Sequence, residues 1–191
     1  MNKPVNIRVA GFGGQGVMLF GQLLSYSATD AELNTIWYPS YGPETRGGTA
    51  NCSVVISSQT INSPVFKNAD HLVVFNAPSL EKFVNDCQPG GLILYNSSII
   101  TPFESPTNVT AIGIPINDIA AELGNARVIN IVLLGAYIAL THLFTKEQIM
   151  DSIRHLFGAS KASLIPINEA ALQKGMDYIR DGGWTYVSPS V

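Results

Sequence analysis

The chain is poor in charged residues. Asp, Glu, Lys and Arg make up 13% of its 191 residues, about half of the share of about 25% that is usual in globular proteins. A soluble monomer normally carries more charge on its surface, so the composition favours a protein that is partly covered by another protein. The net charge is −3 and Lys and Arg form no cluster, which gives no reason to expect nucleic acid as a partner.

Cysteine is scarce as well. Cys52 and Cys87 are the two cysteines of the chain, too few and too far apart for a zinc ribbon or an iron–sulfur cluster held by this chain alone. We therefore expect two free thiols in a cytoplasmic protein, and no metal ion bound by these residues.

Long apolar runs are also missing. The most apolar stretch, Val128 to Leu140, spans thirteen residues and contains Asn130, whereas a membrane-spanning helix needs about 20. This stretch predicts a buried helix and no membrane partner. The residues before Val5 leave no room for a signal sequence ahead of the first predicted strand.

The remaining pattern alternates strands with helices. A short apolar strand, Val5 to Gly11, precedes a segment with helical spacing, Val17 to Ala28. This alternation predicts one α/β domain, a layered fold with a largely parallel sheet. Two β-rich segments, Thr49 to Ser57 and Ile61 to Phe66, predict a hairpin that would make the sheet mixed. Thr145 to Gln148 fits a capping box at the start of a later helix.

Residues 11 to 16, Gly-Phe-Gly-Gly-Gln-Gly, satisfy the pattern G-x-G-x-x-G between a predicted strand and a predicted helix. Backbone N–H groups at such a helix start could hold a phosphate. A dinucleotide-binding fold also needs an acidic residue at the end of its second strand; this chain has no carboxylate there before Glu44, and no Lys between Lys3 and Lys67 for a Walker loop. The structural alternative is that Gly13 and Gly14 only let the first helix pack closely on the sheet.

Residues 39 to 48, Pro-Ser-Tyr-Gly-Pro-Glu-Thr-Arg-Gly-Gly, form a second loop rich in glycine and proline. Their restricted backbone can hold Glu44 and Arg46 at a defined place. Between Val9 and Phe66 the other charged residues are Asp30 and Glu32. The loop is therefore either a tight turn closed by a Glu–Arg pair or a functional loop that presents Arg46 to an anion.

The chain shows no complete catalytic constellation of its own. The three histidines are scattered without ligand spacing, and the nucleophile motif G-x-S-x-G does not occur.

Together, the two loops resemble those of the γ subunit of 2-oxoacid:ferredoxin oxidoreductases. The likeness rests on residues 11–16 and on residues 40–52, Ser-Tyr-Gly-Pro-Glu-Thr-Arg-Gly-Gly-Thr-Ala-Asn-Cys. It extends over nearly the whole chain, including Ser63-Pro64 and the apolar helix near Asn130. It implies that residues 1–191 form a single γ-type domain, like domain III of pyruvate:ferredoxin oxidoreductase. The loop from Glu44 to Thr49 resembles the 2-oxoglutarate type more than the pyruvate type, and branched-chain and indolepyruvate enzymes have related loops.

The resemblance implies a multi-subunit enzyme that oxidatively decarboxylates a 2-oxoacid, transfers the acyl group to coenzyme A and reduces ferredoxin. It places thiamine diphosphate, Mg and the iron–sulfur cluster on partner subunits, α, β and in some enzymes δ, with coenzyme A as the co-substrate that contacts this chain. Arg46 and Glu44 are then expected to position a ligand rather than to catalyse. The expected cofactor-binding residues are Gly11, Gly13, Gly14, Gln15, Gly16, Ser40, Tyr41, Gly42, Arg46, Gly47 and Gly48.

Two other hypotheses are also compatible with the sequence. The chain could be a free-standing module that binds a nucleotide or coenzyme A, or a purely structural subunit whose loops pack against catalytic partners. The neutral surface also leads us to expect a homodimer when the chain is isolated.

Overall fold

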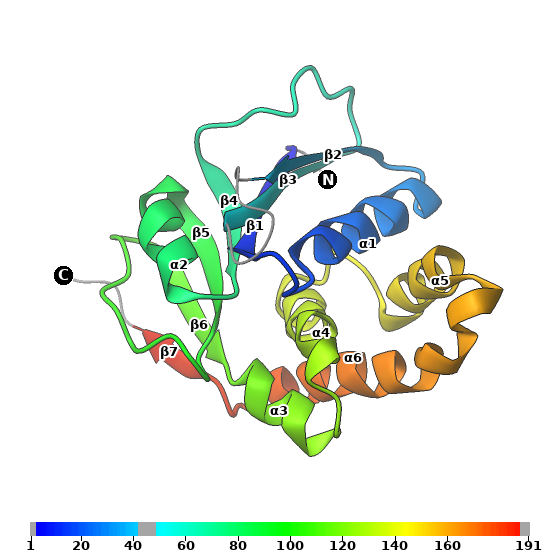
Figure 1. The fold of residues 1–191 in the computed structure, drawn as a ribbon. Helices are drawn as coiled ribbons and strands as arrows, with labels where there is room; N and C mark the ends of the chain where they lie inside the picture. The colour runs from blue at the N-terminus through cyan, green and yellow to red at the C-terminus, as the bar shows by residue number, and fades with distance from the viewer. Residues whose placement is uncertain (1–2, 42–48, 188–191) are drawn as a thin grey trace.

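The computed structural model describes residues 3–41 and 49–187, which form a mixed sheet between two layers of helices (Figure 1). Within these residues the sheet has seven strands in the order β2-β3-β1-β4-β5-β6-β7. Strands β1, β4, β5 and β6 are parallel; β3 is antiparallel to β1 and β2, and β7 is antiparallel to β6. The predicted α/β class and mixed sheet are confirmed. The strands are β1 Val5–Phe12, β2 Asn34–Tyr41, β3 Thr49–Ser57, β4 Ala69–Val74, β5 Cys87–Asn96, β6 Thr110–Ile114 and β7 Thr185–Val187.

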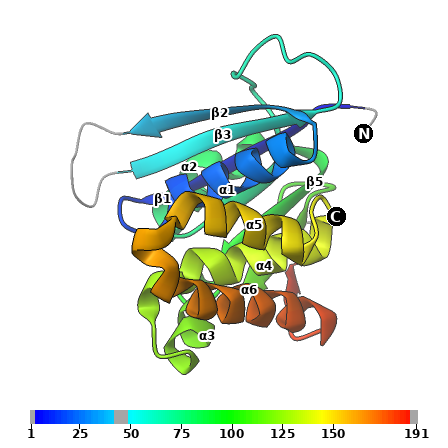
Figure 2. The ribbon, with the colours of Figure 1, turned by 90° about the vertical axis from the view of Figure 1, so that its right-hand side faces the viewer.

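Helices cover both faces of the sheet, and each face has its own core. On one face α1, α3, α4, α5 and α6 bury a large cluster around Phe20, Leu94 and Tyr137. On the other face α2 closes a smaller cluster that includes Leu72 and Tyr95. Figures 1 and 2 show α2 on the opposite side of the sheet from α1, α4 and α6. The helices are α1 Val17–Asp30, α2 Ala77–Phe83, α3 Ile116–Glu122, α4 Ile129–Thr141, α5 Lys146–Phe157 and α6 Ile165–Arg180, with short 3₁₀ turns η1 Val84–Asp86, η2 Ala126–Val128 and η3 Ala159–Leu164.

The predicted hairpin between residues 49–57 and 61–66 is wrong. Strand β3 pairs with β1 on one side and with β2 on the other, so no free edge is left for the segment that follows it. Side chains hold this segment instead. The Arg8 guanidinium lies 5.2 Å from the centroid of the Phe66 ring and 5.0 Å from that of Phe83, and its Nη2 donates to the Phe66 carbonyl oxygen at 3.3 Å.

Helix α4 is the predicted apolar helix, and it is buried along most of its length. It packs on α6 through two glycines. A Cβ on Gly135 would overlap the Leu172 carbonyl oxygen, and a Cβ on Gly175 would overlap the Val132 carbonyl oxygen. The two backbones are therefore in direct contact, and this contact fixes the distance between the helices.

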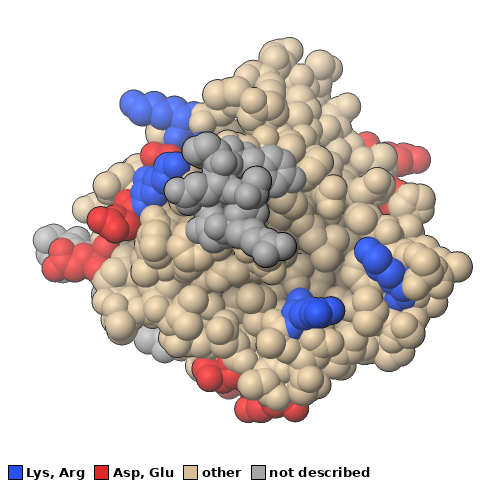
Figure 3. Space-filling view, viewed as in Figure 1, with Lys and Arg blue, Asp and Glu red and all other residues tan. Residues whose placement is uncertain are grey.

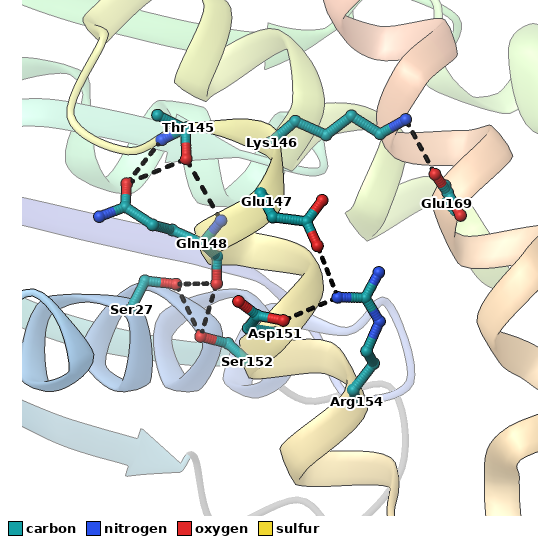
Figure 4. A network of polar contacts seen from close by, with 9 residues as sticks. All are labelled: Ser27, Thr145, Lys146, Glu147, Gln148, Asp151, Ser152, Arg154 and Glu169. Carbon is teal, nitrogen blue, oxygen red and sulfur yellow. Dashed lines mark hydrogen bonds and ion pairs between the residues drawn. The ribbon is translucent and has the colours of Figure 1, made fainter.

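Helix α5 is tied to the fold by polar contacts (Figure 4). Its start has the predicted capping box, formed by Thr145 and Gln148. Farther along, the hydroxyls of Ser152 and of Ser27 on α1 lie 2.8 Å apart in the buried layer between the two helices. Because a buried hydroxyl needs a partner, this pair favours one register of α5 on α1.

A buried histidine–tyrosine pair joins the sheet to α4. His71 Nδ1 lies 2.8 Å from the Tyr137 hydroxyl, and Tyr137 itself is fully buried. Burial lowers the pKa of His71, against a smaller opposing effect of the Asp70 carboxylate. The folded protein therefore favours neutral His71.

Among the residues that the structure describes, no helix combines the length and the apolar composition that a bilayer crossing requires.

Substitution Gly175→Ala should force α4 and α6 apart. Overpacking of this kind usually costs about 1–3 kcal/mol, and the clash here is with a backbone carbonyl that cannot rotate away, so we expect a loss near the upper end. Urea unfolding measures the change in the free energy of unfolding. The matched control is Lys174→Ala, the exposed neighbouring position, which should change it by less than about 0.5 kcal/mol. Equal losses in both variants would contradict the close-contact account.

The stability of the protein should depend on pH through His71. Below the ordinary His pKa of about 6.5 the unfolded chain binds a proton at this site that the folded protein resists. The free energy of unfolding therefore falls as the pH decreases through that value, and the His71→Asn variant should lose this part of the slope. Urea unfolding between about pH 7.5 and pH 5.5 measures it. An unchanged slope in His71→Asn would refute the assignment.

Candidate functional site

The glycine turn and the ends of the second loop lie at one end of the sheet. Residues 11–16 begin with the last two residues of β1, and the register pairs Phe12 with Thr49 and Gly11 with Ala50. Strand β2 ends beside the same residues, because Tyr41 also pairs with Ala50. The two segments that the sequence singled out, about 25 residues apart, are thus brought together by the β1–β3–β2 pairing. Gly42, Glu44, Arg46, Gly47 and Gly48 lie outside the described residues.

This end of the sheet is where α/β folds commonly bind ligands. From β1 the chain proceeds through α1 to β2 and β3 on one side of β1, and then to β4 on the other side. In open α/β sheets, ligands commonly bind beyond the carboxyl ends of the strands where the chain reverses direction in this way. The turn of residues 11–16 and Phe75, the residue after β4, lie where the chain changes from one side of β1 to the other.

Within the turn, the glycines have different roles. Gly13 and Gly14 are exposed, and a Cβ on either would meet no atom within 4 Å. The interpretation that these two let the first helix pack on the sheet is therefore wrong. Gly16 is the residue that packs: its φ is 82°, and a Cβ there would lie 2.5 Å from the side chain of Asn130. Gly11 is similarly crowded by Gln15, Val17 and Phe75.

The turn that precedes α1 is open to a ligand at Gly13 and Gly14. The backbone has φ of 94° at Gly14 and 82° at Gly16, and the first N–H groups of any helix have no partner within the helix. With no side chain in the way, an anion could approach these N–H groups closely. Ser40, at the end of β2, is exposed on the same end of the sheet.

Gln15 is committed to the turn itself. Its side-chain oxygen accepts hydrogen bonds from the Phe12 backbone N–H at 2.7 Å and from Asn76 Nδ2 at 2.8 Å. Asn76 in turn accepts the Ser79 N–H at 2.9 Å and caps α2. The predicted ligand-binding role of Gln15 would have to use its amide nitrogen, because the oxygen already holds the β1 and β4 ends together.

Further carboxamides continue along the carboxyl ends of β5 and β6. Asn96 Nδ2 donates to the Phe75 carbonyl oxygen at 3.3 Å and to Asn117 Oδ1 at 3.0 Å. Ser98 donates its hydroxyl to Asp118 at 2.8 Å. Asn76 and Asn96 were not among the site residues predicted from the sequence; the available signal was an Asn at or close to the end of a buried strand, a common position for a helix cap or a turn.

The face that carries these residues has little charge. Figure 3, viewed as in Figure 1, shows mostly uncharged residues on the part of this face that the grey residues leave visible, with Lys and Arg at its upper left and its lower right and Asp and Glu toward its margins. A neutral polar rim of amides and exposed backbone can bind either an uncharged ligand or an anion that is neutralised by a few cations.

The cysteines do not contribute to a reactive site. Both are buried and free, and burial raises the pKa of each thiol to about 12. Within residues 3–41 and 49–187, no group of three or more His, Cys, Asp or Glu side chains is placed to hold a metal ion.

Comparison with known sequences places these features in a family. The family model of pyruvate ferredoxin/flavodoxin oxidoreductase matches residues 6–178. The chain is 42% identical over 180 residues to ketoisovalerate oxidoreductase subunit VorA of Methanothermobacter marburgensis, covering 93% of this chain and 37% of that protein. It is 36% identical over 154 residues to 2-oxoglutarate synthase subunit KorC of Methanocaldococcus jannaschii, covering 77% and 82%. The chain thus spans little more than a third of the length of the ketoisovalerate relative.

Solved structures share the fold. The γ subunit of a keto/oxoacid ferredoxin oxidoreductase from Geobacter sulfurreducens is 28% identical, with a TM-score of 0.79 over 93% of this chain and 99% of that one. A 2-oxoglutarate:ferredoxin oxidoreductase from Magnetococcus marinus, with 2-oxoglutarate, coenzyme A and succinyl-CoA bound, is 25% identical, with a TM-score of 0.87 over 99% of this chain and 32% of that one.

Substitutions in the turn should separate its two kinds of glycine. Gly16→Ala places a side chain at positive φ, which costs about 1–2 kcal/mol, and also presses on Asn130. Gly13→Ala should leave the free energy of unfolding within about 0.5 kcal/mol of wild type. Urea unfolding of both variants, and of Gly16→Ala combined with Asn130→Ala, measures the contact. A strictly additive double variant would show that Gly16 and Asn130 are not coupled.

Proposed function

Because this chain belongs to the pyruvate ferredoxin/flavodoxin oxidoreductase family, we propose that it works as the γ subunit of a 2-oxoacid:ferredoxin oxidoreductase. The observation that carries the proposal is the family match over residues 6–178, supported by the fold shared with a γ subunit over nearly the whole of both chains. In this role the assembled enzyme oxidatively decarboxylates a 2-oxoacid to an acyl-CoA and passes the electrons to ferredoxin.

Two substrates are supported by different observations. The higher identity to the ketoisovalerate subunit, 42% against 36%, favours a branched-chain 2-oxoacid. The loop from Glu44 to Thr49 favours 2-oxoglutarate, and the chain is 36% identical to a 2-oxoglutarate synthase subunit. We take the branched-chain 2-oxoacid as the first candidate and 2-oxoglutarate as the second.

The redox and decarboxylation cofactors do not fit the residues of this chain. Its two thiols are buried in separate strands with raised pKa values, and the described residues offer no acidic cluster for a metal ion. We therefore assign thiamine diphosphate with its Mg²⁺, and the iron–sulfur cluster, to the α, β or δ partner subunits. There they would supply the decarboxylation and the electron transfer.

The contribution of this chain would be to position coenzyme A. A homologous enzyme has coenzyme A bound, and coenzyme A carries phosphates that suit backbone donors and a guanidinium. We propose that the open backbone at Gly13 and Gly14 and the neighbouring end of β2 at Ser40 face the co-substrate, with Arg46 neutralising one of its phosphates. Residues 1–191 would then act as one domain in the cytoplasm, with the partner subunits and ferredoxin as its partners.

Co-expression with the candidate partner subunits tests the assignment. We expect affinity purification of this chain to recover proteins that carry thiamine diphosphate and iron–sulfur clusters. The purified complex should reduce ferredoxin with ketoisovalerate faster than with 2-oxoglutarate, pyruvate or indolepyruvate. A chain that recovers no such partner, yet binds NAD, ATP or coenzyme A in calorimetry, would instead be a free-standing binding module.

The Arg46→Gln variant separates positioning from assembly. Loss of one charge-assisted hydrogen bond should raise the KM for coenzyme A about tenfold, while the subunit composition of the complex stays unchanged. Lys67→Gln, an exposed lysine elsewhere in the chain, is the matched control. Weaker assembly with an unchanged KM would mean that the loop is purely structural.

A further inference from the structure

A chain of hydrogen bonds connects the start of α2 to the glycine turn. The Ser79 backbone N–H donates to Asn76 Oδ1 at 2.9 Å, and Asn76 Nδ2 donates to Gln15 Oε1 at 2.8 Å. The Phe12 backbone N–H donates to the same Gln15 oxygen at 2.7 Å. Gln15 is therefore held from two sides, by its own turn and by the segment that follows β4.

Backbone groups fix the orientation of both carboxamides. A backbone N–H can only donate, so the atom of Asn76 that faces Ser79 has to be the oxygen, and so does the atom of Gln15 that faces Phe12. Asn76 consequently presents its nitrogen to Gln15. Because Gln15 cannot turn its amide over without losing two hydrogen bonds, its Nε2 keeps one position relative to the turn.

Gln15 Nε2 is left as a donor. It forms no hydrogen bond with the residues that the structure describes, and Gln15 is partly exposed whereas Asn76 is 3% exposed. An amide nitrogen donates two hydrogens and accepts none. The exposed backbone of Gly13 and Gly14 directly precedes Gln15, in the turn proposed above to face coenzyme A. The turn thus offers one oriented side-chain donor beside its backbone donors.

We propose that Gln15 donates through Nε2 to an acceptor oxygen of coenzyme A, and that Asn76 is the positioning residue that keeps this amide in the donating orientation. The inference rests on the function proposed above and deepens it, because it assigns a side chain and a hydrogen-bond direction to the ligand site. The phosphate and carbonyl oxygens of coenzyme A are acceptors that suit such a donor. Asn76 does not touch the ligand; it acts through Gln15.

The Gln15→Glu variant of the assembled enzyme tests the donor. A Glu side chain keeps one oxygen for Phe12 and Asn76, so the turn should stay intact, but its second oxygen cannot donate and repels an acceptor. We expect the KM for coenzyme A in steady-state ferredoxin reduction to rise about tenfold. The KM for ketoisovalerate and the subunit composition should stay unchanged. A Gln15 that only braces the turn would tolerate Glu with no change in either KM.

The Asn76→Asp variant tests the positioning role. Asp can accept the Ser79 N–H and cap α2 as Asn does, but it has no N–H for Gln15 Oε1 and attracts Gln15 Nε2 instead. The donor then turns away from the ligand, and the KM for coenzyme A should rise as in Gln15→Glu. In a Gln15→Met background no amide is left to orient, so adding Asn76→Asp should change the KM by less than about twofold further. Additive effects would mean that Asn76 acts independently of Gln15.

The matched control is Asn125→Asp. Asn125 Oδ1 accepts the Arg127 backbone N–H at 3.0 Å and caps η2. The substitution therefore also replaces a capping asparagine and adds one negative charge, but no hydrogen bond among the described residues links Asn125 to Gln15. It should keep the wild-type KM for coenzyme A. Circular dichroism of each variant checks that the fold is kept.

Two kinds of failure are distinguishable. With a wild-type complex that turns over normally, an unchanged KM for coenzyme A in Gln15→Glu, or an equal rise in Asn125→Asp, would overturn this inference alone. A rise in the KM for ketoisovalerate in place of that for coenzyme A would also overturn it. A wild-type chain that assembles no active enzyme would overturn the proposed function, and this inference with it.

Discussion

The contact between Gly16 and Asn130 determines how α1 sits against α4, and the rest of the candidate site depends on it. A residue with a Cβ at Gly16 would meet the Asn130 side chain at 2.5 Å, so only glycine allows the start of α1 to lie this close. That position sets the direction in which the exposed Gly13–Gly14 backbone faces beyond the sheet. It also closes one wall of a cavity beside Asn168. One close approach thus shapes two neighbouring surfaces, the open turn and a partly open cavity with a mainly apolar lining.

The sheet explains why two loops that are separate in sequence lie at one place. Strand β3 runs antiparallel between β1 and β2. The last residues of β1 and β2 and the first residues of β3 therefore lie at the same end of the sheet. Strands β4, β5 and β6 lie on the other side of β1 and run parallel to it. They place Asn76 and Asn96 at the same end of the sheet. Hydrogen bonds of Asn76 to Gln15 and of Asn96 to Phe75 and Asn117 therefore tie the connections of neighbouring strands together at this end of the sheet.

The sequence predicts what is local and misses what is long-range. The capping box at Thr145, the buried helix α4 and the strand–turn–helix around residues 11–16 depend on neighbours within a few positions, and each is confirmed. The predicted hairpin joined residues 49–57 to residues 61–66, whereas residues 49–57 pair with β2. The propensity of a segment to form a strand does not reveal which other strand it pairs with. The hydrogen bond between Gln15 and Asn76 joins residues 61 positions apart, and no periodicity carries that information. The packing role was predicted for Gly13 and Gly14 but belongs to Gly16. The sequence does not show this, because the side chain that crowds Gly16 is Asn130 of α4, far away along the chain.

Comparison with a longer relative gives a physical reason for the low share of charged residues in this chain. In the ketoisovalerate relative, the matching region is 37% of a longer protein, where a covalent connection keeps the domain near the rest of the enzyme at high effective concentration. A domain that binds partner proteins obtains binding free energy from the surface that it buries. Uncharged exposed side chains are suited to this, because burying them avoids the desolvation cost of charges. Two apolar or aromatic side chains are well exposed: Tyr38 on the outer strand β2, at 52%, and Val65 in the segment after β3, at 72%. Both lie between Val9 and Phe66, where Asp30 and Glu32 are the charged residues among those that the structure describes.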